Sequence, residues 1–403
     1  MKPLFRATRH IALVLALVGM RTLTASAQSE RPTLGARPKP RVSSSEVQPA
    51  TTVAQLDEAF RAFMAREKVP GLSVALARDG QVVWRKAYGF ADLEGQVPAG
   101  LATLFRIGSI SKAITAVAVL RAVDTGRIDL DADVQHYVPA FPAKTSAILV
   151  RQLLTGTGGI RGYIGDEYLR NLHFSSLAAS LSLFRDDTLA YVPGTSYIET
   201  PYGFTLLGLA LEFVAHASYE EYVTREVLRP AHMAATRVDG FTPIMPNRAR
   251  LYTRDSLGHI RNADPIDVSY KVPAGGWIST AADVARLGVA LMDGSLMSQS
   301  GNAAMRAPVR LTDGTQLPLG MGVALGTVGG RLPGTKDAVW ASGLIQGGIA
   351  VLLMYPHDRI AVALLMNVNG EVGAESFRLL TQTTFLADST AIRLRRLRMP
   401  RKP

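Results

Sequence analysis

A serine and a lysine one helical turn apart are the side chains of this sequence most suited to chemistry. The segment Phe105–Lys112 (FRIGSISK) precedes a largely apolar run, so the pattern predicts that Ser109 lies where a helix begins and Lys112 on the same face. A serine hydroxyl is a weak nucleophile unless a neighbouring group takes its proton, and a lysine can do so when its pKa falls toward neutrality. Burial and the positive end of a helix dipole both lower that pKa. Alone, the same spacing is more often a helix-capping serine followed by a surface lysine.

Patterned segments near both ends of the chain predict the elements that position this pair. We expect an amphipathic helix at 56–64, followed by two strands at 71–77 and 82–84 that an Asp79-Gly80 turn joins. Near the other end we expect two further strands at 349–355 and 360–366 and a helix at 371–387. The middle, about 109–290, has several helical runs and few strand signals. We therefore expect an α/β (α+β) fold, in which an antiparallel sheet flanked by helices adjoins a largely helical lobe.

Motifs along most of the chain resemble one family of serine enzymes. They lie in 70–139, which contains the Ser109 segment, and in 150–155, 193–195, 203–208, 274–283 and 319–323. Together they resemble the serine beta-lactamase-like, penicillin-binding hydrolase family over residues 52–388, with its mitochondrial branch nearest. That family includes class C beta-lactamases, D-alanyl-D-alanine peptidases and esterases. The resemblance implies a beta-lactamase/transpeptidase-like fold with Ser109 as nucleophile and Lys112 as its proton acceptor.

The second motif of this family, usually Tyr-x-Asn, is altered here. Counting between Pro193-Gly194-Thr195 and Gly203-Phe204 places Glu199 at the tyrosine position and Pro201 at the asparagine position. A proline side chain donates no hydrogen bond, and a glutamate beside Lys112 favours a resting ion pair. Glu199 is therefore either a substitute base or a silencing change. Tyr197 and Tyr202 are nearby phenols outside this register, and Tyr202 is a candidate substrate-binding residue.

The third motif, usually Lys-Thr-Gly or His-x-Gly on a strand facing the serine, reads Ala341-Ser342-Gly343. Ala341 removes the side chain that would hold a substrate carboxylate. By resemblance, Ser342 and Gly343 line the substrate site. The resemblance also implies that the backbone N–H groups of Ser109 and Leu344 form the oxyanion hole, which needs no particular side chain.

Composition and charge exclude several other functions. The chain of 403 residues has no cysteine, and its seven histidines show no metal-binding spacing, so we expect neither a metal nor a cofactor. The net charge is +11, but four basic residues lie in the first 27 positions and six in the last thirteen, which leaves the body at +1. We therefore expect no nucleic-acid partner.

The ends of the chain predict export. Residues 1–27 have basic residues, an apolar run at 11–20 and small residues before Gln28, which is typical of a signal peptide. Residues 28–50 are expected to be a flexible linker, 51–390 the hydrolase domain and 391–403 a basic tail with weak attraction to anionic surfaces. A periplasmic or secreted location follows.

Two functions remain open from the sequence. The favoured one is an exported serine hydrolase that cleaves an ester, peptide or beta-lactam-like substrate through an acyl-enzyme on Ser109, with weak activity because of the altered motifs. The alternative is a catalytically degraded relative that binds a peptide or cell-wall fragment, or serves as a scaffold.

Overall fold

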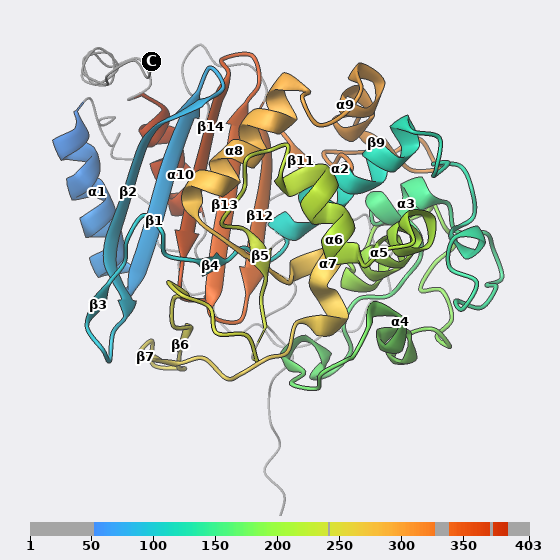
Figure 1. Ribbon diagram of the computed structural model, residues 1–403, viewed down its shortest axis with the longest axis horizontal. Coiled ribbons are helices and arrows are strands. Elements are labelled where there is room, and N and C mark those ends of the chain that lie inside the picture. The colour runs from blue at the N-terminus through green and yellow to red at the C-terminus, as the bar shows by residue number, and fades with distance from the viewer. Residues whose placement is uncertain (1–51, 241, 327–337, 371–373, 386–403) are drawn as a thin grey trace, which may run out of the picture. The chain divides into compact units, whose positions relative to one another are not determined.

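Both ends of the described chain contribute strands to one seven-stranded antiparallel sheet (Figure 1). The computed structural model describes residues 52–240, 242–326, 338–370 and 374–385. The strand order is β11-β12-β13-β14-β1-β2-β3, so that β1 pairs with β14 on one side and with β2 on the other. In chain order the strands are β1 (Gly71–Arg78), β2 (Gln81–Asp92), β3 (Val97–Pro98), β11 (Ala324–Leu325), β12 (Val339–Ile345), β13 (Gly348–Tyr355) and β14 (Ile360–Met366).

Helices cover both faces of this sheet. On one face lie α8 (Ala281–Asp293) and α2 (Ile110–Asp124), and on the other lie α1 (Val53–Arg66) and α10 (Ala374–Phe385). Every residue of β13 and β14 is buried. Strands covered on both faces are apolar along their whole length rather than alternating, which explains the continuous hydrophobic runs in this part of the sequence.

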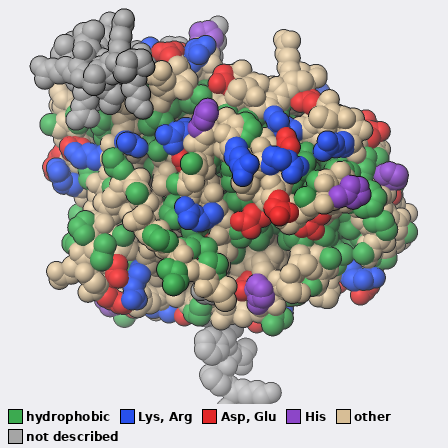
Figure 2. Space-filling model, viewed as in Figure 1, with side chains coloured by type: hydrophobic (Ala, Val, Ile, Leu, Met, Phe, Trp, Pro, Cys, Tyr) green, Lys and Arg blue, Asp and Glu red, His purple; other side chains and the backbone are tan. Residues whose placement is uncertain are grey.

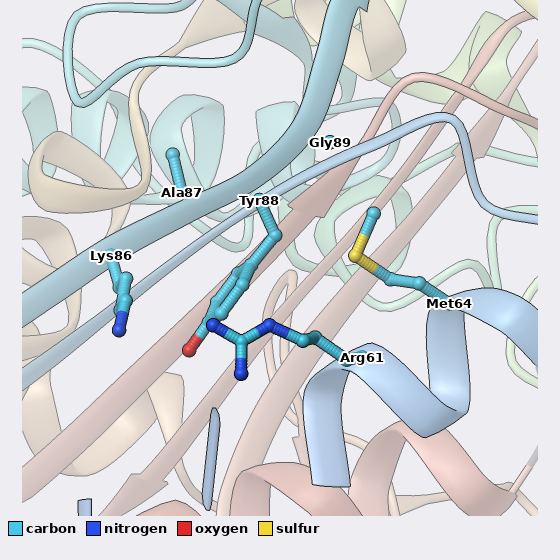
Figure 3. Close-up of a pocket in the computed structure, with 6 residues that line it drawn as sticks. All are labelled: Arg61, Met64, Lys86, Ala87, Tyr88 and Gly89. Carbon is cyan, nitrogen blue, oxygen red and sulfur yellow. The ribbon is translucent and has the colours of Figure 1, made fainter. Parts of the chain in front are cut away.

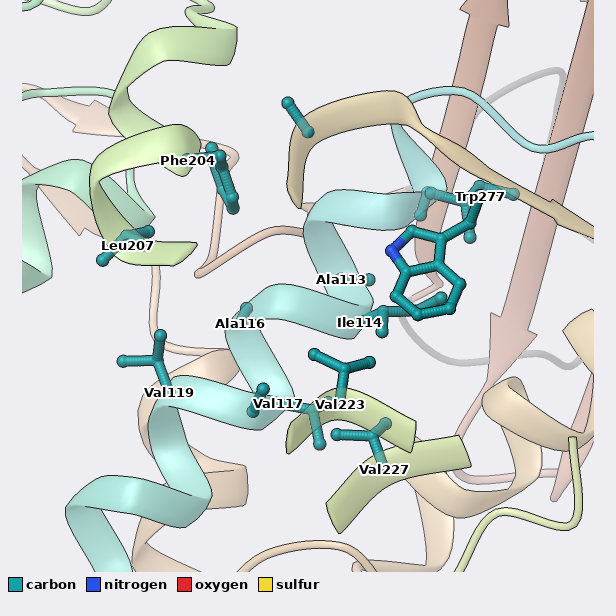
Figure 4. Close-up of a cluster of buried hydrophobic side chains, with 14 of the residues drawn as sticks. Ala113, Ile114, Ala116, Val117, Val119, Phe204, Leu207, Val223, Val227 and Trp277 are labelled. Carbon is teal, nitrogen blue, oxygen red and sulfur yellow. The ribbon is translucent and has the colours of Figure 1, made fainter. Parts of the chain in front are cut away.

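The helical lobe is built around α2, which is buried on nearly all sides (Figure 4). Val117 and Val119 of this helix lie in the same core as Phe204 and Trp277. The other helices are α3 (Val150–Leu154), α4 (Leu177–Ser180), α5 (Pro201–Ala215), α6 (Tyr219–Val223), α7 (Val272–Gly275) and α9 (Gln299–Met305), with a π-helical turn at Thr224–Leu228 and 3₁₀ turns at Val134–His136, Glu167–Leu169, Leu181–Leu183 and Ser269–Lys271. A helix with no polar face is stable only inside such a core.

Short strands connect the lobe with the sheet. A three-stranded sheet has the order β4-β8-β5, and two further pairs are β6 with β7 and β9 with β10. Their bounds are β4 (Phe105–Arg106), β5 (Arg237–Val238), β6 (Tyr252–Arg254), β7 (Ile260–Asn262), β8 (Trp277–Ser279), β9 (Val309–Arg310) and β10 (Gln316–Leu317). Strand β4 leads directly into α2 and thus fixes where that helix begins.

The predicted fold class is confirmed, as are the two strands at each end and the turn at Asp79-Gly80, where both residues have positive φ. The predicted signal peptide, linker and basic tail lie outside the described residues. Within the described residues, no helix is both long and apolar enough to cross a bilayer. Figure 2 shows basic and acidic side chains side by side on one face, in agreement with a nearly neutral body.

Candidate active site

Ser109 lies at the start of α2, in a sharp turn that follows β4. Gly108 has a φ of +49°, a conformation that glycine adopts with little strain. Ser109 occupies the N-cap position, yet its side chain accepts no capping hydrogen bond from the helix. The helix-capping explanation of the Ser-x-x-Lys spacing therefore does not apply, and the hydroxyl is available for chemistry.

Lys112 and Glu199 meet beside this hydroxyl. Lys112 Nζ donates to Glu199 Oε1 at 2.7 Å, and Ser109 Oγ lies 3.5 Å from the same oxygen. The Lys112 side chain is 12% exposed and also lies over the ring of Phe204, 5.5 Å from its centroid. The positive charge of Lys112 holds the pKa of Glu199 below its ordinary value. The structure thus brings the three candidate catalytic side chains together around one carboxylate oxygen.

The remainder of the altered second motif has a structural role. Thr200 caps α5 and Pro201 takes the first helical position, where a missing backbone N–H leaves no hydrogen bond unmade. Tyr197 packs against Gly156, where an added Cβ would lie 2.7 Å from the tyrosine ring.

Tyr202 is not a substrate-binding residue, and that prediction was wrong. Its side chain is fully buried, and its hydroxyl donates to Glu167 Oε2 at 2.8 Å. At the second position of α5, the side chain points into the lobe rather than toward Ser109. Counting along the sequence could not show which way the first turn of this helix faces.

The backbones at Ser109 and Leu344, the two positions predicted to form the oxyanion hole, approach one another closely. Gly343 approaches the nucleophile turn so closely that a Cβ on it would lie 1.9 Å from the carbonyl oxygen of Ile107 and 2.7 Å from the nitrogen of Ser109. A Cβ on Gly108 would likewise lie 3.0 Å from the nitrogen of Leu344. The two glycines therefore allow the strand and the nucleophile turn to approach closely, which the predicted oxyanion hole requires.

The other residues of the third motif are arranged by strand alternation. Ala341 pairs with Leu352 and is buried in the core that includes α2. Ser342 pairs with Val351, which belongs to the core on the opposite face of the sheet. Within the described part of the chain, the Ser342 hydroxyl makes no hydrogen bond to the three candidate catalytic side chains. Gly343 is thus the residue of this triplet that contacts the nucleophile turn.

A buried ion pair braces the turn from behind. Arg106 Nε donates to Asp239 Oδ2 at 2.6 Å, and its Nη1 donates to the carbonyl of Gln346 at 2.9 Å. Both charged side chains are almost inaccessible, at 2% and 1% exposure. Because Gln346 directly follows β12, Arg106 joins the nucleophile turn to the strand of the oxyanion hole. Sequence reasoning missed Asp239, which lies far along the chain and has no local signal.

A cavity of about 460 Å³ lies elsewhere, between α1 and β2 (Figure 3). Its lining residues are Arg61, Met64, Lys86, Ala87, Tyr88 and Gly89. Asp57 accepts hydrogen bonds from both Lys86 and Tyr88 beside it. None of the candidate catalytic side chains lines this cavity. Among the described residues, no group of three or more histidine and acidic side chains could hold a metal ion.

Ser109 at the start of a helix, Lys112 one turn along and strand β12 beside the same turn together define the candidate site of a beta-lactamase/transpeptidase fold. The chain belongs to the Beta-lactamase family, which matches residues 56–384. It is 28% identical over 295 residues to the human serine beta-lactamase-like protein LACTB, mitochondrial, an alignment that covers 56% of this chain and 54% of that protein. The chain therefore spans about half the length of this relative.

Solved structures show the same fold. An octameric penicillin-binding protein homologue from Pyrococcus abyssi superposes with a TM-score of 0.70 and 24% identity, covering 84% of this chain and 78% of the other. EstCE1, a hydrolase with promiscuous acyltransferase activity, superposes with a TM-score of 0.66 and 22% identity, covering 82% of this chain and 97% of the other. At these identities the likeness concerns the fold alone.

Proposed function

We propose that this protein is a serine hydrolase that cleaves uncharged esters or amides through an acyl-enzyme on Ser109. The observation that carries the proposal is the convergence of Ser109 Oγ, Lys112 Nζ and Glu199 Oε1 beside the N–H groups of Ser109 and Leu344. This set contains a nucleophile, a proton acceptor, a cation that stabilises developing charge and an oxyanion hole.

The first half of the reaction forms the acyl-enzyme. Ser109 Oγ attacks the substrate carbonyl carbon, and its proton passes to Glu199 Oε1, the basic oxygen beside it in the resting state. The carbonyl oxygen becomes negatively charged and accepts hydrogen bonds from the two backbone N–H groups. The tetrahedral intermediate then collapses, the bond to the leaving group breaks, and the leaving alkoxide or amine takes the proton from Glu199.

The second half releases the acid. Water attacks the acyl carbon and gives a proton to Glu199. The bond to Ser109 Oγ breaks as that proton returns to the serine. Lys112 stays beside Glu199 throughout and stabilises the charge of the carboxylate with which it is paired. Because that pairing lowers the pKa of Glu199, the carboxylate is a weak base, and we expect slow turnover.

The substrate class follows from the third motif. Ala341 stands where the resemblance to the family's third motif predicts a lysine or histidine, so no side chain at this position can pair with a substrate carboxylate. We therefore expect uncharged short esters to be better substrates than carboxylate-bearing peptides or beta-lactams.

A fluorophosphonate probe tests the proposal directly. We expect one covalent adduct on Ser109, detected by mass spectrometry of the intact protein and of its peptides, and no adduct on the Ser109→Ala variant. The same variant should lose hydrolysis of p-nitrophenyl acetate. Folded wild-type protein that forms no adduct and shows no Ser109-dependent turnover would contradict the proposal.

A binding or scaffold function is the second candidate, and the ion pair between Lys112 and Glu199 favours it. That pair engages the amine which in the family accepts the serine proton. In this case, Ser109→Ala would retain full affinity for a peptidoglycan fragment, measured by calorimetry, while wild-type protein would show no turnover of that fragment.

We further propose that the protein is exported to the periplasm or secreted, on the basis of the signal-peptide pattern in residues 1–27. Expression of the full chain in a bacterium, followed by cell fractionation and N-terminal sequencing, tests this. A mature chain that begins at Gln28 outside the cytoplasm is expected, whereas an unprocessed cytoplasmic chain would contradict it.

A further inference from the structure

A closed ring of hydrogen bonds surrounds the start of α5, immediately after Glu199. The hydroxyl of Thr200 donates to the carbonyl of Arg161 at 2.5 Å and accepts from the backbone N–H of Tyr202 at 3.2 Å. The hydroxyl of Tyr202 donates to Glu167 Oε2 at 2.8 Å. Glu167 in turn accepts from Arg161 Nη1 and Nη2 at 2.7 and 3.1 Å, which closes the ring.

The members of this ring are well removed from solvent. Tyr202 is fully buried, Thr200 is 4% exposed and Glu167 is 8% exposed. Burial raises the pKa of Glu167, but hydrogen bonds from Arg161, from the backbone N–H of Ile164 and from Tyr202 hold it below its ordinary value. A buried ion pair adds little stability compared with apolar packing of the same volume. The hydrogen bonds of this pair instead hold Arg161, Glu167 and Tyr202 in fixed relative positions.

The ring determines how firmly the backbone at Glu199 is held. Among the described residues, the carboxylate of Glu199 forms hydrogen bonds only with Lys112 and Ser109, and its side chain is 40% exposed. Side-chain packing therefore does little to restrain it, and its direction depends on where the backbone at 199 is held. The next three residues include two members of the ring, and Pro201 between them has a fixed φ.

We infer that Glu167, together with Arg161 and Tyr202, positions the carboxylate of Glu199 against Lys112 and Ser109. These are positioning residues, since none of them contacts the serine. The inference rests on the proposed function for its effect on rate, but the effect on the ion pair of Glu199 is independent of turnover. If the ring is opened, the backbone at 199 moves more freely and the ion pair loosens.

The Tyr202→Phe variant opens the ring by removing one hydroxyl and no packing. Glu167→Gln keeps the size of the side chain but removes the charge that pairs with Arg161. Tyr137→Phe is the matched control, because the Tyr137 hydroxyl is also buried in the lobe and accepts one hydrogen bond, from the N–H of Asp129 at 2.8 Å. It has no connection with Glu199.

The first measurement is an NMR titration of the Glu199 carboxyl in protein labelled with ¹³C-glutamate, assigned with the Glu199→Gln variant. We expect the pKa of Glu199 to lie below the ordinary range in wild-type protein, to rise in Tyr202→Phe and Glu167→Gln, and to stay unchanged in Tyr137→Phe. A pKa of Glu199 that does not respond to opening the ring would overturn the inference, whether or not the protein proves to be an enzyme.

The second measurement is a double-mutant cycle on ester hydrolysis. A displaced catalytic group commonly costs up to about 100-fold in rate, so we expect kcat to fall roughly 10- to 100-fold in Tyr202→Phe with little change in KM. In the Glu199→Gln background, Tyr202→Phe should cause no further fall. An equal fall in both backgrounds would contradict the inference, because Tyr202 would then act independently of Glu199. Absence of wild-type turnover would instead refute the proposed function.

Discussion

The Glu199→Gln variant distinguishes two roles for this residue by the sign of its effect. The substitution keeps the size of the side chain and removes its charge. It therefore eliminates both the basic oxygen 3.5 Å from Ser109 Oγ and the partner of Lys112. If Glu199 accepts the serine proton, hydrolysis must slow. If Lys112 is the true base and its ion pair with Glu199 only keeps the amine engaged, the variant must be faster than wild type, because the amine can then approach Ser109 Oγ.

The magnitude can be worked out for the first case. Loss of a positioned general base costs about 10²- to 10⁴-fold in rate, which corresponds to about 2.7–5.4 kcal/mol of transition-state stabilisation. The effect on folding must be measured separately, because the Lys112 side chain is only 12% exposed and loses its ion-pair partner in this variant. A fall in rate at unchanged stability is then attributable to the reaction.

The assay is hydrolysis of p-nitrophenyl acetate across pH, with urea denaturation as the measure of stability. Glu226→Gln is the control, since Glu226 pairs with Arg121 and Arg225 away from the site and should leave the rate unchanged. Because Lys112 lowers the pKa of Glu199, wild-type activity should persist below the ordinary glutamate pKa of about 4.3 and be lost at still lower pH. A Glu199→Gln variant with the wild-type rate at every pH would refute both roles.

Three further outcomes are expected. Gly343→Ala should lower kcat for ester hydrolysis at least about 100-fold. The new Cβ would lie 1.9 Å from the carbonyl oxygen of Ile107 and would push the two oxyanion-hole N–H groups apart. A wild-type rate in this variant would contradict the expectation. Asp239→Asn should destabilise the protein by about 3–5 kcal/mol in urea denaturation, since it leaves the buried Arg106 without its counter-charge, and a loss under about 1 kcal/mol would speak against it. Burial lowers the pKa of Lys271 to about 7, so between pH 7 and 9 the unfolded chain binds more protons than the folded chain. The free energy of unfolding should therefore rise by about 2 kcal/mol over that range. Lys271→Met should abolish this contribution, and an unchanged rise in the variant would refute it.

The parts of the site that local rules govern could be predicted from the sequence. Ser109 and Lys112 lie one turn apart on a helix, so their proximity follows from helical geometry alone. Counting from the flanking motifs predicts the position of Glu199, and the structure confirms that this residue lies beside Lys112. The terminal strands were predictable because their hydrophobic runs are long and end at turn residues.

The parts that depend on distant partners could not be predicted. Arg106 and Asp239 are separated by 133 positions, and no periodicity links them. The direction of Tyr202 depends on Glu167, which lies 35 positions earlier in a segment without regular structure apart from a short 3₁₀ turn. Such contacts form only when the lobe has packed, because each side chain can adopt several rotamers until its partner is in place.

The pairing of β1 with β14 constrains how the chain can acquire its structure during synthesis. Strand β1 is synthesised hundreds of residues before β14, its neighbour in the sheet, so one edge of β1 stays without its partner until β14 has been made. Strand β12, which carries the Leu344 amide, is likewise synthesised after the helical lobe. A ribosome stalled after the helical lobe would therefore hold a nascent polypeptide with its nucleophile already made but with no means of stabilising an oxyanion.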